Sequence, residues 1–482
     1  MSIDTGIPTS LRTPGSYINF DLTSAMRGLV ALTRRVALIG MKSSAGSQAV
    51  ATPVQVFSDD QADTLFGKGS ELALMIRRAF RAGRKAGNLP EIYGVAVAAP
   101  SGASQTKTFT MTGPATASGT LRIRVAGRVI SIGVNSGDTA TVVASAIDSA
   151  LDALNYDLPV TSGSAAGVVT VTFVTTGVNG ADLVVSVDSD SVPAGLTCVA
   201  ATATAGTGAY DITASLDTLV DKHYHAIVIA NHASTDITDL AAHTTARSAS
   251  GVKKWTYGFI AENASLAAST TLASSANSEY AVIVSAEAYP NMTGEIAAAV
   301  AVTRMAQEDP TLSISGVELD LDACPAVSVY TPGAGGEVES ALSGGTTPLS
   351  VNAQGRVYVV RLFTSKTTVS SVAFDKVRDF GVMYGLTRLS EELDALIEIF
   401  RANPENKKAT ADMRKRLRSV LLEKLRFLEA KPYQWVQNVE AHKDELQVEG
   451  DPSVPQRTNV DLPASIVPGA EQTAMKVRLF VE

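Results

Sequence analysis

The sequence contains little charge and few aromatic residues. Charged residues make up 18% of its 482 residues, against roughly 25% in an average globular protein, and aromatic residues make up only 6%. Hydrophobic residues nevertheless reach 45%, which excludes a disordered chain, because disorder requires low hydrophobicity together with high net charge. A surface so poor in charge predicts that part of it is covered by other subunits.

Long apolar runs, basic excess and cysteine are also scarce. The longest clean apolar run, residues 296–302, is far shorter than the roughly 18 residues of a membrane-spanning helix. Residues 1–9 lack a basic segment followed by an apolar one, so we expect no signal peptide. The net charge of −8 argues against nucleic acid as a partner. The two cysteines, Cys198 and Cys324, favour buried thiols in a reducing compartment.

No motif for catalysis or cofactor binding is complete. The segment Gly40-Met41-Lys42-Ser43 follows a predicted strand, but the leading glycine of a phosphate-binding loop is replaced by Arg35. His223 and His225 lie two residues apart and would face the same side of a strand, as a metal-binding pair does. No cysteine or regularly spaced carboxylate completes that ligand set. We therefore expect no catalytic residues, no metal and no cofactor, and we expect that the protein is not an enzyme.

Two separated parts of the chain follow an α/β pattern. Residues 35–40 and 92–98 are predicted strands, and residues 71–84 between them form a predicted helix with Ser70 as its N-cap. Predicted strands and helices alternate again after residue 210, with an alanine-rich helix at 294–305. Together these parts predict an α/β core formed by residues 23–100 and 210–350.

The segment between them has a different composition. Residues 101–209 hold only eleven charged side chains, none of them glutamate, and are rich in threonine, valine, serine and glycine. A hairpin is predicted where residues 121–125 and 128–132 flank Ala126-Gly127, and a helix follows with Asp138 as its cap. The segment is therefore predicted to be a β-rich domain inserted into the α/β core.

Charge is concentrated near the carboxyl end. Of the 71 residues from 376 to 446, 26 are charged, over two amphipathic helical patterns within a predicted domain at 351–450. The second pattern carries a basic set: Arg414, Lys415, Arg418, Lys424 and Arg426. These side chains indicate either a solvated face or a surface for an acidic protein partner.

Both ends of the chain read as extended arms, residues 1–22 and 451–482. Each contains proline and a strand of alternating apolar residues with no obvious local partner: Tyr17, Ile18 and Phe20 in the first, Val477, Leu479 and Val481 in the second. Unpaired strands commonly complete a sheet on a neighbouring chain. Arms at both ends predict head-to-tail linkage into rings or helical arrays.

Several of these segments, in this order, resemble the tail sheath proteins of contractile-tailed bacteriophages, most closely those of the Mu-like kind. The resemblance is carried by the sequences RTPGSY at 12–17, FGKGSEL at 66–72, NAQGRV at 352–357 and AMKVRLF at 474–480. It covers nearly the whole chain, and residues 101–209 correspond to the variable protruding insertion of that family.

The resemblance implies a multidomain α/β (α+β) fold with a non-catalytic core of the subtilisin-like kind. It further implies subunits stacked as six-fold rings around a tail tube, with the arms linking neighbours and the basic helix facing the tube. The implied partners are other copies of the chain, the tube, and the baseplate and tail terminator proteins, without nucleic acid or direct membrane insertion. Contraction would drive the tube through the host envelope for genome ejection, in a virion assembled in the host bacterial cytoplasm.

Two alternatives stay open at this point. The same architecture serves in bacteriocin-type and secretion-type contractile particles, and the sequence does not separate these from a phage. A protein of another class, an enzyme or a carbohydrate-binding protein with a β-rich binding insertion, is the second alternative, although it lacks a recognisable catalytic set.

Overall fold

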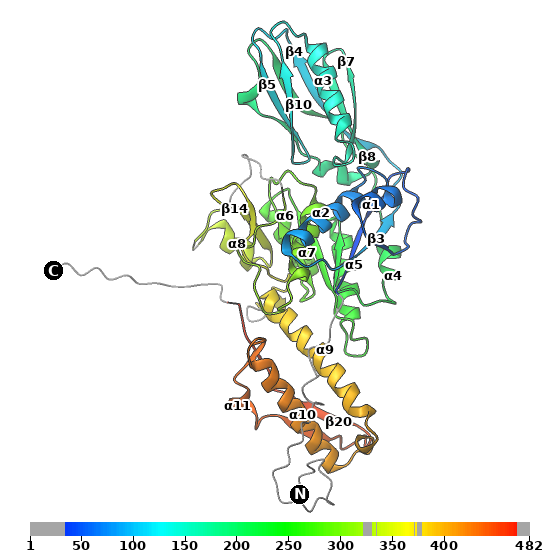
Figure 1. Ribbon diagram of the computed structural model, residues 1–482, viewed down its shortest axis with the longest axis vertical. Coiled ribbons are helices and arrows are strands. Elements are labelled where there is room, and N and C mark those ends of the chain that lie inside the picture. Colours follow the sequence, from blue (N-terminus) through cyan, green and yellow to red (C-terminus); the bar gives the residue numbers. More distant parts are fainter. Residues whose placement is uncertain (1–33, 322–329, 334, 371, 374–377, 470–482) are drawn as a thin grey trace, which may run out of the picture.

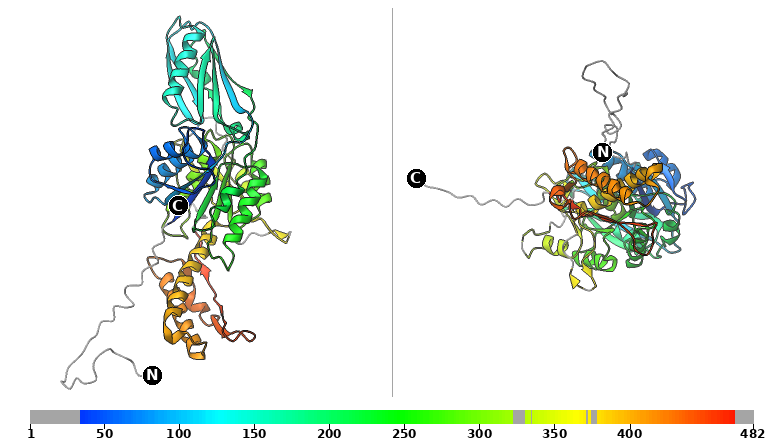
Figure 2. Two further views of the ribbon diagram at one scale, coloured as in Figure 1. Left: turned by 90° about the vertical axis from the view of Figure 1, so that its right-hand side faces the viewer. Right: turned by 90° about the horizontal axis from the view of Figure 1, so that it is seen from below.

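A computed structural model describes residues 34–321, 330–333, 335–370, 372–373 and 378–469. The described chain is elongated and has three tiers (Figure 1). A β-rich module, residues 104–204, lies at one end, an α/β layer lies in the middle, and a pair of long helices lies at the other end. The left view of Figure 2 keeps this order along the long axis.

The middle tier is built on one eight-stranded sheet with the order β15-β14-β13-β12-β11-β1-β3-β2. Six neighbouring strands are parallel, and the short strands at the two edges are antiparallel. The parallel strands are β1 (Arg35–Met41), β3 (Glu91–Val97), β11 (Ala226–Ile229), β12 (Tyr257–Glu262), β13 (Ala281–Ser285) and β14 (Thr347–Val351), and the edges are β2 (Val54–Val56) and β15 (Val357–Val359).

Helices cover both faces of this sheet, as its almost fully buried strands require. One face carries α1 (Asp59–Phe66), α2 (Glu71–Ala86) and α7 (Thr293–Ala306), and the other carries α5 (Ser234–Arg247) and α6 (Leu266–Ala276) (Figure 2). Alternate residues of β1 divide between two apolar clusters: Leu38 packs with the α2 face and Ile39 with the opposite face. Short helices α4 (Thr213–Asp217) and α8 (Glu337–Ser343) complete the tier.

The module contains a four-stranded antiparallel sheet, β10-β4-β8-β7, and a three-stranded one, β6-β5-β9. Its one α-helix, α3, buries Val143, Ile147 and Leu151 against these strands. The elements are β4 (Ser104–Thr112), β5 (Gly119–Val125), β6 (Arg128–Val134), α3 (Ala140–Ala153), β7 (Val160–Ala165), β8 (Val168–Thr176), the 3₁₀ turn η1 (Val178–Asp182), β9 (Val185–Val187) and β10 (Thr197–Thr204).

The third tier is a helical hairpin with small antiparallel sheets. Helix α9 (Phe380–Ala402) starts within the apolar cluster of the α/β layer and extends away from it, and α10 (Ala411–Glu429) returns alongside. The 3₁₀ turn η3 (Pro404–Asn406) follows α9. Strands β18 (Val436–Gln437) and β21 (Ser465–Ile466) pair, as do β19 (Gln447–Gly450) and β20 (Thr458–Asp461), and helix α11 (Val439–His442) lies between β18 and β19.

Most individual elements expected from the sequence are confirmed. Ser70 caps α2, its Oγ accepting a hydrogen bond from the Ala73 N–H at 3.3 Å. The hairpin of β5 and β6 turns at Ala126 and Gly127, whose φ angles of 46° and 85° fit the tight turn type that twists with its strands. The two amphipathic helices near the carboxyl end are α9 and α10.

Three expectations differ from the structure. Thr139, not Asp138, caps α3, because the Asp138 carboxylate accepts from the Asn135 N–H of the preceding turn at 2.7 Å. Strands β4, β7 and β10 of the module were not predicted. The segment from residue 451, expected as an extended arm, pairs with this chain's own strands as far as Ile466, since β20 and β21 lie against β19 and β18.

None of the helices in the described ranges combines the length and the apolar character needed to cross a bilayer.

Candidate functional site

The six residues expected to link subunits lie outside the described residues. Tyr17, Ile18 and Phe20 belong to residues 1–33, and Val477, Leu479 and Val481 belong to residues 470–482. Their role as linking strands therefore stays a prediction.

The five basic residues expected to face a partner all lie on α10. Met413, Leu417, Leu421 and Leu425 form the buried face of this helix. Around them the helix carries Arg414, Lys415, Arg418, Lys424 and Arg426.

Two of the five cations are used within the chain. The Lys424 Nζ lies 2.8 Å from Glu392 Oε2 of α9, and these side chains are only 14% and 1% exposed. Arg418 donates to the backbone carbonyls of Leu446 and Lys443 at 2.9 and 2.8 Å. These contacts hold α10 to α9 and to the segment before β19. Glu392 neutralises the buried Lys424, whereas the Arg418 side chain is anchored but 40% exposed.

The other three lie nearer the surface. Lys415 is exposed, Arg414 donates to the Ala409 carbonyl at 3.2 Å, and Arg426 pairs with Glu440. The prediction of a partner-facing helix therefore rests mainly on these three residues, of which Lys415 and Arg426 are exposed.

A groove that the sequence did not reveal runs beside Lys415. It has a volume of about 550 Å³ and lies where the end of α9 meets the start of α10. Leu396, Ile399, Phe400 and Val420 give it an apolar lining, and Lys415 and Arg416 stand at its border. Only the pairing of the two helices creates it, which is why no local sequence pattern could indicate it.

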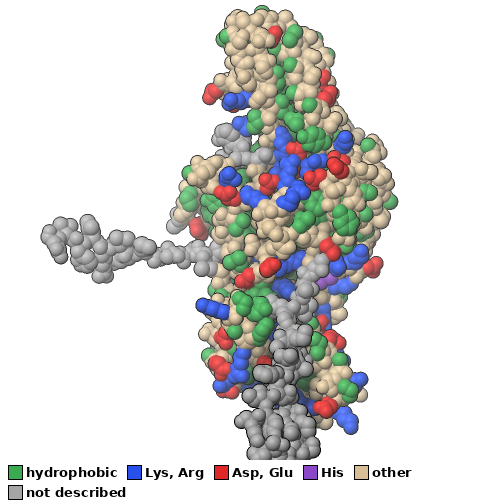
Figure 3. Space-filling view, viewed as in Figure 1, with side chains coloured by type: hydrophobic (Ala, Val, Ile, Leu, Met, Phe, Trp, Pro, Cys, Tyr) green, Lys and Arg blue, Asp and Glu red, His purple; other side chains and the backbone are tan. Residues whose placement is uncertain are grey.

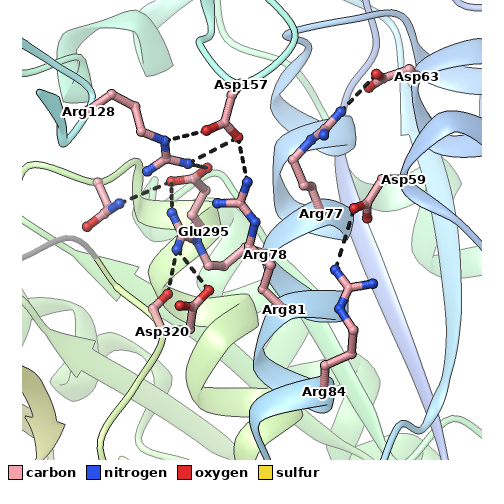
Figure 4. A network of polar contacts seen from close by, with 11 residues as sticks. Asp59, Asp63, Arg77, Arg78, Arg81, Arg84, Arg128, Asp157, Glu295 and Asp320 are labelled. Carbon is pink, nitrogen blue, oxygen red and sulfur yellow. Dashed lines mark hydrogen bonds and ion pairs between the residues drawn. The ribbon is translucent and has the colours of Figure 1, made fainter. Parts of the chain in front are cut away.

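A row of arginines on α2 joins the module to the α/β layer (Figure 4). Asp157 of the module lies 2.6 Å from Arg128 Nε and 3.2 Å from Arg81 Nη2 of α2. Arg128 is also 3.8 Å from Glu295 of α7. Burial would raise the pKa of Asp157, but the hydrogen bond and charge of Arg128, with the charge of Arg81, lower it below its ordinary value.

Further along α2 the same row continues within the core. Arg78 lies 3.6 Å from Glu295 and 3.3 Å from Asp320, and Arg77 lies 2.8 Å from Asp63. Figure 3 shows the resulting gathering of basic and acidic side chains where the module meets the middle tier. The module is thus held by buried ion pairs as well as by its two connecting segments.

A second polar junction centres on His232, which follows β11. Its Nδ1 lies 2.8 Å from Glu262 Oε2 at the end of β12, and its Nε2 lies 3.1 Å from both oxygens of Asp182 in the module. Burial alone would lower the pKa of His232, but the two carboxylates outweigh it and raise the pKa to about 10. At neutral pH both ring nitrogens are therefore protonated donors, and this histidine is unsuited to act as a general base.

Glu71, the first residue of α2, is the buried centre of a third junction. Its carboxylate accepts from Asn179 Nδ2 of the module at 2.9 Å and from the Met41 N–H at 3.0 Å. Tyr210, whose hydroxyl lies 3.4 Å from the same carboxylate, marks the chain's return to the core. Burial, only partly offset by Asn179, raises the pKa of Glu71.

The expected histidine pair precedes β11 and does not lie on a strand, but its two rings face each other and have a third neighbour. His223 and His225 stack with ring centroids 4.2 Å apart, and Glu391 of α9 brings a carboxylate within 4.8 Å of their nitrogens. The three residues could surround a cation. However, the Arg35 N–H donates to His225 Nδ1, which places the proton of the neutral ring on Nε2, the nitrogen left to face a ligand.

The charges around the pair also disfavour a metal. Burial and nearby positive charge lower the pKa of His225 well below its ordinary value, which leaves the ring neutral, but the charges of Arg388, Arg34 and Arg35 would repel a cation. Burial likewise raises the pKa of Glu391. We therefore interpret the cluster as a polar contact between the α/β layer and α9, in which Glu391 also pairs with Arg388, next to the hydrogen bond from Tyr257 to Thr387.

The comparisons with known proteins agree with the resemblance described above. No family model matches the chain. Over 167 residues the chain is 38% identical to a Mu-like prophage tail sheath protein of Haemophilus influenzae, a match that covers 34% of this chain and 33% of that protein. The aligned part thus spans about a third of the curated relative.

Solved structures extend the likeness to most of the chain. A sheath tail protein from Desulfitobacterium hafniense is similar in fold with a TM-score of 0.50 at 13% identity, covering 91% of this chain and 94% of that one. A sheath tail protein from Listeria innocua gives a TM-score of 0.48 at 17% identity, over 89% and 91% of the two chains. The predicted resemblance is confirmed: this chain is similar in sequence to a Mu-like tail sheath protein and has the mixed α/β fold of a sheath tail protein.

Proposed function

We propose that this protein is the structural subunit of a contractile tail sheath, which polymerises around a tail tube. The observation that carries the proposal is the 38% identity to a Mu-like prophage tail sheath protein. The shared fold with a sheath tail protein, over 91% of this chain, supports it independently. We further propose that the α/β core has the subtilisin-like architecture of this family and that the protein catalyses no reaction.

In this proposal the arms supply the linkage between subunits. The apolar strands around Tyr17 and Val477 complete sheets on neighbouring copies, so that six-fold rings stack into one connected helical lattice. The module, residues 104–204, forms the protrusion on the outside, and Arg414 and Arg426 of α10 approach the tube.

Contraction is a rigid-body rearrangement of folded subunits between two packings. The ion pairs between the module and core, Arg81–Asp157 and Arg128–Glu295, and the pair between α9 and α10 keep each subunit intact while its neighbours move. A difference of a few kcal/mol per subunit is sufficient when many subunits switch together. The contracting sheath drives the tube through the host envelope for genome ejection.

The sheath's partners in the assembled particle are the tube protein, the baseplate and the tail terminator. The particle is a virion whose tail is assembled in the host bacterial cytoplasm. The prophage origin of the similar protein favours a phage tail over a bacteriocin-type or secretion-type particle.

Electron microscopy of the purified full-length chain tests the proposal. We expect helical tubes of uniform diameter with six-fold symmetry. Variants lacking residues 1–22 or residues 471–482 should keep the thermal stability of the parent but form no tubes. A chain that stays monomeric at every concentration would contradict the sheath function, and arm-deleted variants that form normal tubes would contradict the role of the arms.

A further inference from the structure

Phe57 is the most exposed large hydrophobic side chain among the described residues. It is 71% exposed and occupies the two-residue connection between β2 and α1, at an edge of the main sheet. Aromatic side chains contribute strongly to protein interfaces because they bury a large area with few rotatable bonds. An aromatic ring displayed in this way indicates a surface that meets a partner.

The backbone around Phe57 is fixed on both sides. Val56 before it is buried and pairs with Ile92 of β3. The Phe57 N–H donates to Gln61 Oε1 at 2.8 Å, and the Gln61 N–H donates to Ser58 Oγ at 3.2 Å. These reciprocal bonds across the start of α1 fix the backbone that carries the ring, which lowers the backbone entropy lost on binding.

The α9–α10 groove offers a matching surface at the far end of the molecule. Ile399 is 54% exposed beside the nearly buried ring of Phe400, so the groove presents apolar area to solvent. In Figure 1 α1 lies in the middle tier, whereas the α9–α10 turn lies at the opposite end from the module. Phe57 and the groove of one copy are therefore too far apart to meet each other.

The charges beside the two surfaces are complementary. Asp60 is exposed one turn from Phe57, while Asp59 is partly engaged by Arg84 at 3.5 Å. At the border of the groove Arg416 pairs with Glu405 at 3.2 Å, and Lys415 beside them is exposed. A copy that places Phe57 in the groove can bring Asp60 towards Lys415, which favours this orientation over others.

We propose that Phe57 of one copy inserts into the α9–α10 groove of a second copy, with Asp60 facing Lys415. The contact joins two different surfaces, so it is heterologous and propagates into open arrays or rings. It rests on the proposed sheath function, which supplies the repeating copies, and it assigns Lys415 to a neighbouring sheath subunit rather than to the tube.

Cross-linking tests the contact directly. Full-length Phe57→Cys and Ile399→Cys variants are mixed and oxidised, with the parent chain as the control for Cys198 and Cys324. We expect a covalent dimer in the mixture, several-fold more abundant than in either variant alone. Absence of this excess would overturn the proposal even if the parent chain forms tubes, and the sheath function would then stand without it.

Assembly of complementary variants provides the second test. Phe57→Ala removes the inserted ring but leaves the groove open, and Ile399→Arg keeps the ring but blocks the groove. We therefore expect either variant alone to need a concentration at least about tenfold higher than the parent to assemble. Mixed together they restore one contact per pair, so the mixture should assemble at a lower concentration than either variant alone. Val199→Ala, which removes an equally exposed apolar side chain from the module, should assemble as the parent does.

A charge exchange identifies the occupant. Asp60→Lys and Lys415→Glu should each weaken self-association, and the double variant should recover it, while all three keep the parent's melting temperature. If Phe57→Ala and Lys415→Glu associate normally but Lys415→Glu loses binding to the tail tube protein, the groove holds the tube and the proposal is wrong. The proposal would also be wrong if Phe57→Ala associates normally and a terminal segment of the chain is found bound in the groove.

Discussion

At the scale of single residues, Gly69 allows the module to approach the core closely. Its φ is +67°, and a Cβ at this position would lie 2.4 Å from the Leu158 carbonyl oxygen and 2.9 Å from that of Asn155. Both oxygens belong to the segment between α3 and β7 of the module. The glycine therefore satisfies a conformational and a steric requirement at the same junction.

We expect Gly69→Ala to lower the free energy of unfolding by about 3 kcal/mol, because strain at positive φ adds to the clash with Leu158. Gly87→Ala is the matched control: its φ is +79°, but nothing lies within 4 Å of an added Cβ. The control should cost only about 1 kcal/mol. Urea unfolding followed by circular dichroism measures both, and equal losses would show that the close approach has no energetic importance.

His232 should make the stability depend on pH. The pKa of His232 is raised from 6.5 to about 10 in the folded chain, so its charged contacts with Asp182 and Glu262 stabilise fully below pH 6.5. This stabilisation declines above pH 6.5 and is lost as the pH rises through about 10.

We therefore expect His232→Gln to reduce stability by about 3 kcal/mol at pH 6, because it leaves two buried carboxylates without their cation. The difference between parent and variant should shrink steadily towards pH 10. Thermal unfolding at pH 6, 8 and 10 measures it. A difference that is the same at all three values would mean that His232 is not charged in the folded chain.

At the scale of elements, the sequence predicts helices whose signals lie within a few residues, and it misses strands that depend on pairing with distant segments of the chain. Helix α2 shows its cap and its apolar stripe within 16 residues, so its bounds could be predicted. Strands β7 and β10 were missed because their Ser, Thr, Ala and Gly residues give little contrast between faces, and both strands are largely exposed. Backbone hydrogen bonds from β8 to β7 and from β4 to β10 hold these segments extended, although their own residues do not indicate strands.

The junctions were missed for a related reason. Asp182 and His232 are 50 residues apart, and Asp157 and Arg81 are 76 apart, so only the folded chain brings them together. The pair His223 and His225 was visible because its members lie two residues apart in the sequence, although they precede β11. Glu391, which faces them from α9, has no sequence pattern that links it to β11.

Helix α2 should hold the module through Asp157. We expect Asp157→Asn to cost about 3 kcal/mol, because Arg128 and Arg81 then lose the charge that compensates their burial. Amide hydrogen exchange should accelerate in the segment from 154 to 159 and at the start of α2. Asp190→Asn, an exposed aspartate of the same module, is the control and should leave exchange unchanged. Equal protection in both variants would contradict a clamping role for the arginine row.

At the scale of the whole molecule, the buried apolar clusters do not coincide with the three tiers seen in the ribbon. Figure 1 shows three tiers, but one continuous cluster joins Phe109 and Leu183 of the module to Met41 and Val97 of the main sheet. The helical tier instead has two small clusters of its own, around Leu428 with Trp435 and around Phe400 with Leu421. The module thus shares its core with the middle tier, whereas the helical hairpin largely does not.

This division predicts the order of unfolding in urea. We expect peptides from β8 and β1 to lose protection against hydrogen exchange at the same urea concentration. Separating the module would expose Met41 and would remove Asn179 from Glu71 and Asp182 from His232. Peptides from α10 should lose protection at a lower concentration, because its small clusters bury less apolar area. If β8 opens before β1, the module is an independent unit, and its ion pairs with α2 orient it without joining it to the core.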